Sequence, residues 1–170
     1  MTDIEQFRPS KLWKQMPPGR RLQAAEAFWQ DEHSVEQHAE AVMAVAQRLK
    51  FRAKSAAALP VEKKAKHLAA LTSLSDTLAG RLLVSYHLTT QRPMMGRFLD
   101  ALQIAHEDGL ITEEELKAPS AELLGSAARA LAADFPRDDV ELYFATLVSQ
   151  DPETWQGLTE VLPRGSAEGF

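Results

Sequence analysis

Apolar residues recur at three- and four-residue spacing along nearly the whole chain of 170 residues, and this periodicity constrains the fold more than any other feature. Such spacing gathers apolar side chains on one face of an α-helix, whereas a half-buried strand requires strict alternation. No alternating run is long enough to predict a strand. The sequence therefore predicts an all-α fold, a compact multi-helix domain of about seven or eight helices that is compatible with stacked helical hairpins.

Proline and N-cap residues divide the pattern into segments. Pro17 and Pro18 precede the first clear helix, which we expect to end near Asp31. Ser34 and Gln37 form the capping-box sequence of a second helix, which we expect to fray over residues 51–58. Further helix starts are predicted at Pro60, Ser75, Ser120, Pro136 and the pair Asp151–Pro152, and a helix must stop or kink before Pro93.

Three of these helices begin with an apolar residue followed by proline, which raises the question of an internal repeat. The pairs are Met16–Pro17, Leu59–Pro60 and Phe135–Pro136. The prolines are 43 and 76 residues apart, whereas a solenoid requires a fixed period. We therefore interpret the pairs as ordinary helix starts.

Composition indicates a globular chain that folds in a reducing compartment. The chain is 45% hydrophobic and 25% charged, and it contains no cysteine, which excludes disulfides, thiolate metal ligands and a cysteine nucleophile. Neither a secretion signal nor a membrane-spanning apolar run is recognisable. We expect a cytoplasmic protein with one helical domain over residues 1–162 and a loose tail over residues 163–170.

Charge is distributed unevenly along the chain. Residues 1–106 carry 15 Lys+Arg against 10 Asp+Glu, whereas residues 107–170 carry 4 against 14. Cations are densest over residues 48–67, where Glu62 is the only acid; the segment holds Arg48, Lys50, Arg52, Lys54, Lys63, Lys64 and Lys66. Such a cluster can neutralise phosphates, with Phe51 available for stacking, so nucleic-acid binding is one alternative function. Because the chain is acidic overall, we favour a solvated or partner-facing surface.

The stretch IAHEDGLITEEEL, residues 104–116, resembles the second half of an EF-hand calcium loop. With Gly109 at the sharp turn, Asp108 takes the fifth position and Glu115 the twelfth. The first position falls on Ile104, which has no oxygen ligand, and the third falls on His106. We therefore interpret Gly109 as a helix stop and Thr112 as the capping residue of a new turn.

Three histidines lie on or beside apolar stripes and could converge between helices. His38, His87 and His106 each follow or precede an apolar residue by four positions, and three imidazoles would resemble the ligand set of a catalytic zinc. No His-x-x-x-His or Glu-x-x-His spacing supports this arrangement. A metal-dependent enzyme that uses these histidines is the second alternative, and we expect no metal or other cofactor.

No nucleophile elbow, phosphate-binding loop or dinucleotide fingerprint occurs in the sequence. The leading expectation is therefore a non-catalytic protein-interaction or scaffolding module that binds a protein partner or associates with itself. Trp29 neighbours Phe28 on one helix, so the two rings point in different directions, and we expect Trp29 to be an exposed anchor. The other candidate binding residues are acidic: Glu107, Asp108, Glu113, Glu114 and Glu115.

Overall fold

The structure is a computed structural model that describes residues 4–31 and 35–162. The capping residue predicted at Ser34 and the tail predicted over 163–170 lie outside these ranges. The elements, in chain order, are a 3-10 helix η1 (Ile4–Phe7), α1 (Pro9–Gln15), α2 (Pro18–Gln30), α3 (Val35–Leu49), α4 (Ala53–Ala57), α5 (Val61–Ala70), α6 (Asp76–Thr90), α7 (Arg92–Ala101), β1 (His106–Glu107), β2 (Leu110–Ile111), α8 (Ala121–Asp134), α9 (Arg137–Gln150), α10 (Pro152–Trp155) and a second 3-10 helix η3 (Gln156–Glu160).

The all-α prediction is confirmed, and most helices begin where proline or a cap residue places them. Pro60 and Pro136 are the N-cap residues of α5 and α9, and the Asp151 side chain accepts a hydrogen bond from Thr154 N at the start of α10. The described residues form ten α-helices rather than seven or eight. The additional short helices are α1, which the sequence did not mark, and α4, where we expected fraying.

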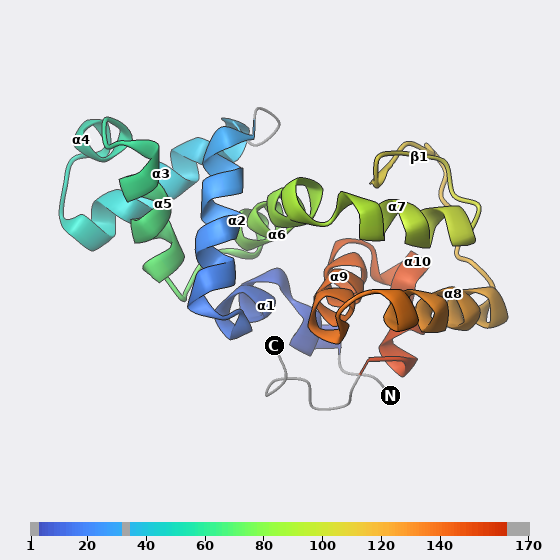
Figure 1. The fold of residues 1–170 in the computed structure, drawn as a ribbon. Coiled ribbons are helices and arrows are strands. Elements are labelled where there is room, and N and C mark those ends of the chain that lie inside the picture. Colours follow the sequence, from blue (N-terminus) through green and yellow to red (C-terminus); the bar gives the residue numbers. More distant parts are fainter. Residues whose placement is uncertain (1–3, 32–34, 163–170) are drawn as a thin grey trace.

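The molecule is elongated, with α6 in its middle (Figure 1). Helices α3, α4 and α5 form one end, and α7, α8 and the β-hairpin form the other. α2 packs along both α5 and α6, while α6 also contacts α1 and α9. One connected set of buried side chains runs from Phe7 to Leu162, and the fully buried Trp13 and Trp155 belong to it. Trp13 Nε1 donates to the carbonyl of Leu71 at 2.7 Å, so its polar atom is satisfied within the core.

The N-cap residue of α6, Ser75, allows the contribution of a capping side chain to stability to be measured. Ser75 Oγ accepts from Leu78 N at 3.1 Å and donates to the carboxylate of Glu40 on α3. We expect Ser75→Ala to lower the free energy of unfolding by about 1 to 2 kcal/mol, because one helix donor loses its acceptor. Urea denaturation will measure this change. Ser120→Ala is the matched control, since Ser120 Oγ caps Leu123 N alone, and its cost should be the smaller of the two.

The segment between α7 and α8 departs from the prediction. Asp108 and Gly109 have φ values of 49° and 92°, which is the pair of positive φ angles that a two-residue type I′ hairpin turn requires. The turn pairs β1 with β2 in antiparallel register, His106 opposite Ile111. The helix stop and capping box predicted at Gly109 and Thr112 are therefore wrong. Thr112 N instead donates to the carbonyl of Ala105.

Candidate functional site

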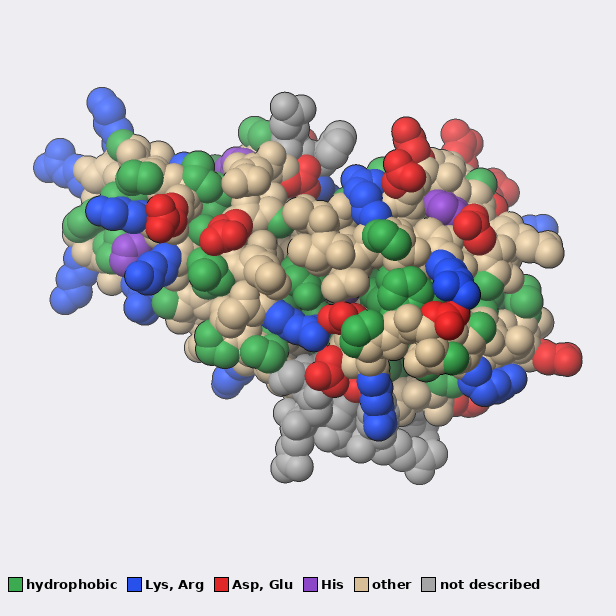
Figure 2. All heavy atoms as spheres, in the orientation of Figure 1, with side chains coloured by type: hydrophobic (Ala, Val, Ile, Leu, Met, Phe, Trp, Pro, Cys, Tyr) green, Lys and Arg blue, Asp and Glu red, His purple; other side chains and the backbone are tan. Residues whose placement is uncertain are grey.

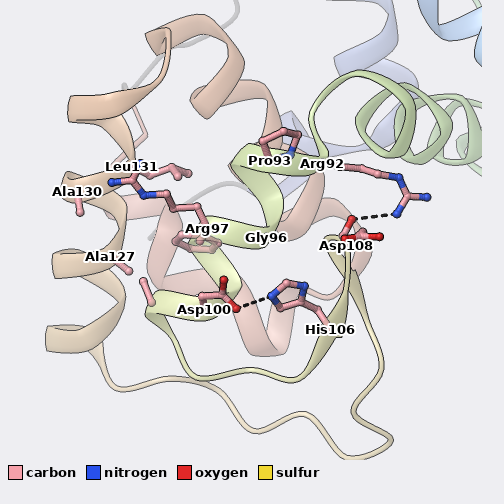
Figure 3. A pocket seen from close by; sticks show the side chains of 12 residues that line it. Arg92, Pro93, Gly96, Arg97, Asp100, His106, Asp108, Ala127, Ala130 and Leu131 are labelled. Carbon is pink, nitrogen blue, oxygen red and sulfur yellow. Dashed lines mark hydrogen bonds and ion pairs between the residues drawn. The ribbon is translucent and has the colours of Figure 1, made fainter.

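A groove of about 770 Å³ lies between α7, the β-hairpin and α8 (Figure 3). We call it the hairpin groove. Its lining is Arg92, Pro93, Gly96, Arg97, Phe98, Asp100, Ala101, His106, Asp108, Ala127, Ala130 and Leu131. The floor is apolar and consists mostly of small side chains from α7 and α8, which leave room between the two helices. The charged side chains stand around it, so the groove suits a ligand with an apolar part and a polar surround.

His106 fastens the hairpin to α7. Gly96 makes room for the imidazole, because a Cβ atom at this position would lie 3.3 Å from His106 Cε1. Asp100 follows Gly96 by one helical turn on the same face. Its Oδ1 atom lies 2.7 Å from His106 Nε2, while Gly109 N donates to His106 Nδ1 at 3.1 Å. Since Nδ1 accepts, Nε2 carries the hydrogen and donates to Asp100.

Two arginines support the walls of the groove. Arg92 Nη1 donates to the Asp108 carbonyl at 2.9 Å and ties the hairpin turn to the start of α7. Arg97 forms an ion pair with Asp134 and so joins α7 to the end of α8. Figure 3 shows the Arg97 side chain directed toward Ala130 and Leu131, and the Arg92 side chain directed toward Asp108. Both cations thus make contacts that hold the groove together.

This arrangement suits binding better than acid–base catalysis. Both ring nitrogens of His106 are engaged, so no lone pair is available to abstract a proton or to bind a metal. The Asp100 side chain is 76% exposed and has a second oxygen at the rim. A carboxylate in that position can accept a hydrogen bond from a cationic group of a ligand.

The three histidines of the predicted metal site do not converge. His38 Nε2 lies 2.9 Å from the carbonyl of Phe28 on α2, and its ring contacts the Phe28 and Trp29 rings. His87 on α6 pairs with Thr146 on α9, and His106 is held by α7. Within residues 4–31 and 35–162, no group of three or more His, Asp or Glu side chains could hold a metal. The alternative of a metal-dependent enzyme with these ligands is therefore wrong.

Trp29 is buried, so the expectation of an exposed anchor is also wrong. Its side chain is only 8% exposed and packs edge-to-face on Phe28. Lys64 covers the ring, with Nζ at 4.7 Å from the ring centroid. The two rings point in different directions, and both are nevertheless buried: His38 of α3 contacts both rings, and Lys64 of α5 covers Trp29. A tryptophan in this position stabilises the packing and is not free for a partner.

The cations of the 48–67 segment gather at the end formed by α3, α4 and α5 (Figures 1 and 2). Six of them are exposed and define what we call the basic tip: Arg48, Lys50, Arg52, Lys54, Lys63 and Lys66. None forms an ion pair with a carboxylate in the part of the chain that the structure describes. Lys64 is half-buried and donates to the Ala57 carbonyl, so its first role is structural.

The acidic residues predicted to bind a partner lie together on the hairpin and the chain that follows it. We call Glu107, Asp108, Glu113, Glu114 and Glu115 the acidic corner; all five are exposed. Glu113 Oε1 accepts from Ala105 N at 2.8 Å, which closes the base of the hairpin. Glu107 and Asp108 belong to the hairpin and not to a helix C-terminus.

Sequence reasoning located the basic tip and the acidic corner but missed the hairpin groove. The groove depends on Gly96, Asp100 and α8, which approach the hairpin only in the folded chain. The dipeptide Asp108–Gly109 was the local signal that could have predicted the hairpin wall of the groove, because Asp-Gly favours a type I′ hairpin turn.

The chain matches no protein-family model, and neither a curated protein nor a solved structure is significantly similar to it. Among the described residues, no helix combines the length and apolar character needed to cross a bilayer.

Proposed function

We propose that this chain is a non-catalytic protein-interaction module, active in the cytoplasm, that binds an acidic protein surface through the basic tip. The observation that carries the proposal is the set of six exposed cations at one end of the molecule, none of which has an ion-pair partner within the described ranges. Ordinary solvated surfaces mix both signs of charge more evenly, whereas over residues 48–67 these six exposed cations stand against one exposed acid, Glu62.

The positions of the cations support a binding role over a stabilising one. Lys63 lies in the first turn of α5, and Arg52 is the N-cap residue of α4. A helix N-terminus carries partial positive charge, so cations there contribute nothing favourable to the helix. Arg48, in the last turn of α3, and Lys54, in the last turn of the short α4, lie where the macrodipole favours a cation. Local helix stability therefore accounts for part of the charge of the tip and not for Arg52 or Lys63.

Apolar side chains among the cations favour a protein partner. Phe51 follows Lys50 directly and is 48% exposed, and Val61 at the start of α5 is 40% exposed. Protein interfaces combine an apolar or aromatic centre with a polar rim. The remainder of the molecule is unfavourable for a long polyanion, because residues 92–162 carry 5 Lys+Arg against 14 Asp+Glu.

Native co-purification with and without nuclease, followed by mass spectrometry, tests the proposal. The variant Arg52→Glu with Lys63→Glu reverses two tip charges and places carboxylates near helix N-termini, where they are favourable, so its folding is protected. We expect the wild-type chain to retain an acidic protein after nuclease treatment. The amount of this protein that co-purifies with the variant should be at least about tenfold lower. Lys14→Glu with Arg129→Glu, two exposed cations elsewhere that carry the same total charge change, should retain it.

Two results would contradict the proposal. Equal retention of the partner by the wild-type chain and the tip variant would remove the tip from the interaction. Recovery of nucleic acid in place of protein, with salt-dependent binding lost on Lys63→Glu, Lys64→Glu and Lys66→Glu, would establish the nucleic-acid alternative through Lys50, Arg52, Lys54, Lys63, Lys64 and Lys66.

A further inference from the structure

The two charged regions of the molecule lie too far apart to meet within one copy. The basic tip is at the end formed by α3, α4 and α5, and the hairpin groove with the acidic corner is at the opposite end (Figures 1 and 2). Opposite charges at the two ends of an elongated molecule attract one another between copies, and salt screens this attraction.

The groove complements the tip in apolar character. Its floor is formed by side chains such as Ala101, Ala127 and Ala130, and a volume of about 770 Å³ leaves room for an aromatic ring. The tip presents Phe51, which is 48% exposed and stands between Lys50 and Arg52. An aromatic ring that enters an apolar groove removes both surfaces from water.

The rim of the groove complements the tip in charge. Asp100 keeps one carboxylate oxygen outside its bond to His106, and its side chain is 76% exposed. Glu107 lies on β1 between the lining residues His106 and Asp108, and Glu114 and Glu115 lie in the chain that follows the hairpin. All three are exposed and form no hydrogen bond or ion pair within the described parts of the chain. Of the two cations in the lining, Arg97 pairs with the Asp134 carboxylate, and Arg92 donates to the main-chain carbonyl of Asp108.

We infer that the acidic partner of the basic tip is the hairpin groove of a second copy of this chain. The inference rests on the proposed function and names its partner. In such a contact Phe51 lies over the apolar floor, and the neighbouring cations face the carboxylates of the rim. The contact is heterologous, so each added copy leaves one free tip and one free groove, and growth continues with concentration. Because the attraction is largely electrostatic, salt weakens it.

Sedimentation velocity over micromolar to near-millimolar concentrations, at about 50 mM and about 500 mM salt, tests the inference. We expect the average mass of the wild-type chain to rise with concentration at low salt and to stay monomeric at high salt. The tip variant, Arg52→Glu with Lys63→Glu, should remain monomeric. A groove variant, Glu107→Lys with Glu114→Lys and Ala130→Arg, should also remain monomeric, because it reverses two acidic charges and places a cation on the groove floor. Its fold should be retained, because all three positions are exposed and the His106 contacts stay intact.

Mixing the two variants separates a tip-to-groove contact from general association. The tip variant keeps an intact groove and the groove variant keeps an intact tip, so an equimolar mixture should form a 1:1 dimer that does not grow further. The Lys14→Glu, Arg129→Glu control should assemble as the wild type does. Wild-type protein that stays monomeric throughout, or variants that fail to pair on mixing, would overturn the inference. If the wild-type chain then still retains another acidic protein through its tip, the proposed function stands without it.

Discussion

Acidification from about pH 7 to about pH 4.5 is expected to lower the free energy of unfolding by roughly 3 kcal/mol through His87 alone. Burial of the ring, assisted by the positive charge of Arg20, lowers the pKa of His87 to about 3 from its ordinary value of 6.5. The histidine is therefore neutral when folded and gains a proton when the chain unfolds at moderately low pH. The stability that its neutral form contributes is complete above pH 6.5 and is lost as the pH falls toward 3.

The hydrogen bonds explain why His87 must stay neutral. Thr146 Oγ1 donates to the Leu142 carbonyl at 2.8 Å, so it can only accept from His87 Nε2, which lies 3.0 Å away. Nδ1 is buried and has no hydrogen-bond partner among the residues that the structure describes. Protonation at Nδ1 would place a charged donor among the rings of Tyr86 and Tyr143, where no group in the described ranges accepts it.

Urea denaturation at several pH values will measure this effect, with His87→Gln as the informative variant. The amide does not titrate, so the decline in stability below pH 6.5 should be reduced by roughly 3 kcal/mol relative to the wild type. His67→Gln on α5 is the control, and it should reproduce the wild-type pH dependence. Parallel curves for the wild type and His87→Gln would show that His87 does not carry the acid sensitivity.

Asp76 makes the free energy of unfolding depend on pH in a lower range. Hydrogen bonds from the side chain of Ser10 and then from Arg8 hold the pKa of this carboxyl at about 2, below its ordinary 3.8. Its contribution is present above pH 3.8 and is lost as the pH falls through 2. The acid transition assigned to His87 begins at higher pH, so the two can be separated in one titration.

The sequence was a reliable guide wherever one local signal decided the outcome. Ser75 and Ser120 cap α6 and α8 as predicted, because a hydroxyl near free helix N–H groups acts over three residues. His87 was predicted to lie beside an apolar stripe, and it does. Its partner Thr146 is 59 residues away, so periodicity could not reveal the pair.

The sequence was misleading where tertiary contacts decide between two local conformations. Trp29 occupies a helix position that could have been exposed, and only the packing of α3 and α5 around α2 buries it. The 104–116 segment contains signals for both a helix end and a hairpin. The hairpin forms because His106 and Asp108 each bind α7, and a helix stop at Gly109 would leave both without those partners.

The hairpin makes Gly109 the most sensitive single position near the groove. Its φ of 92° is strained for any residue with a side chain, and a Cβ atom would lie 2.7 Å from Met95 Cβ. The β-carbon of Met95 is fixed to the backbone of α7 and cannot rotate away. We expect Gly109→Ala to lower the free energy of unfolding by about 2 to 4 kcal/mol, through backbone strain together with the steric clash.

Gly19→Ala is the matched control, because a Cβ atom there meets nothing within 4 Å and Gly19 lies in the first turn of α2. This change should stabilise the chain by up to about 1 kcal/mol, since alanine favours a helix over glycine. Thermal and urea unfolding will measure both variants, and exchange of the backbone amide at position 109, in the wild type and in Gly109→Ala, will report the bond to His106 Nδ1. A variant Gly109→Ala with wild-type stability and an equally protected amide would mean that the hairpin does not rest on α7. The groove would then lose the wall on which its acidic rim depends.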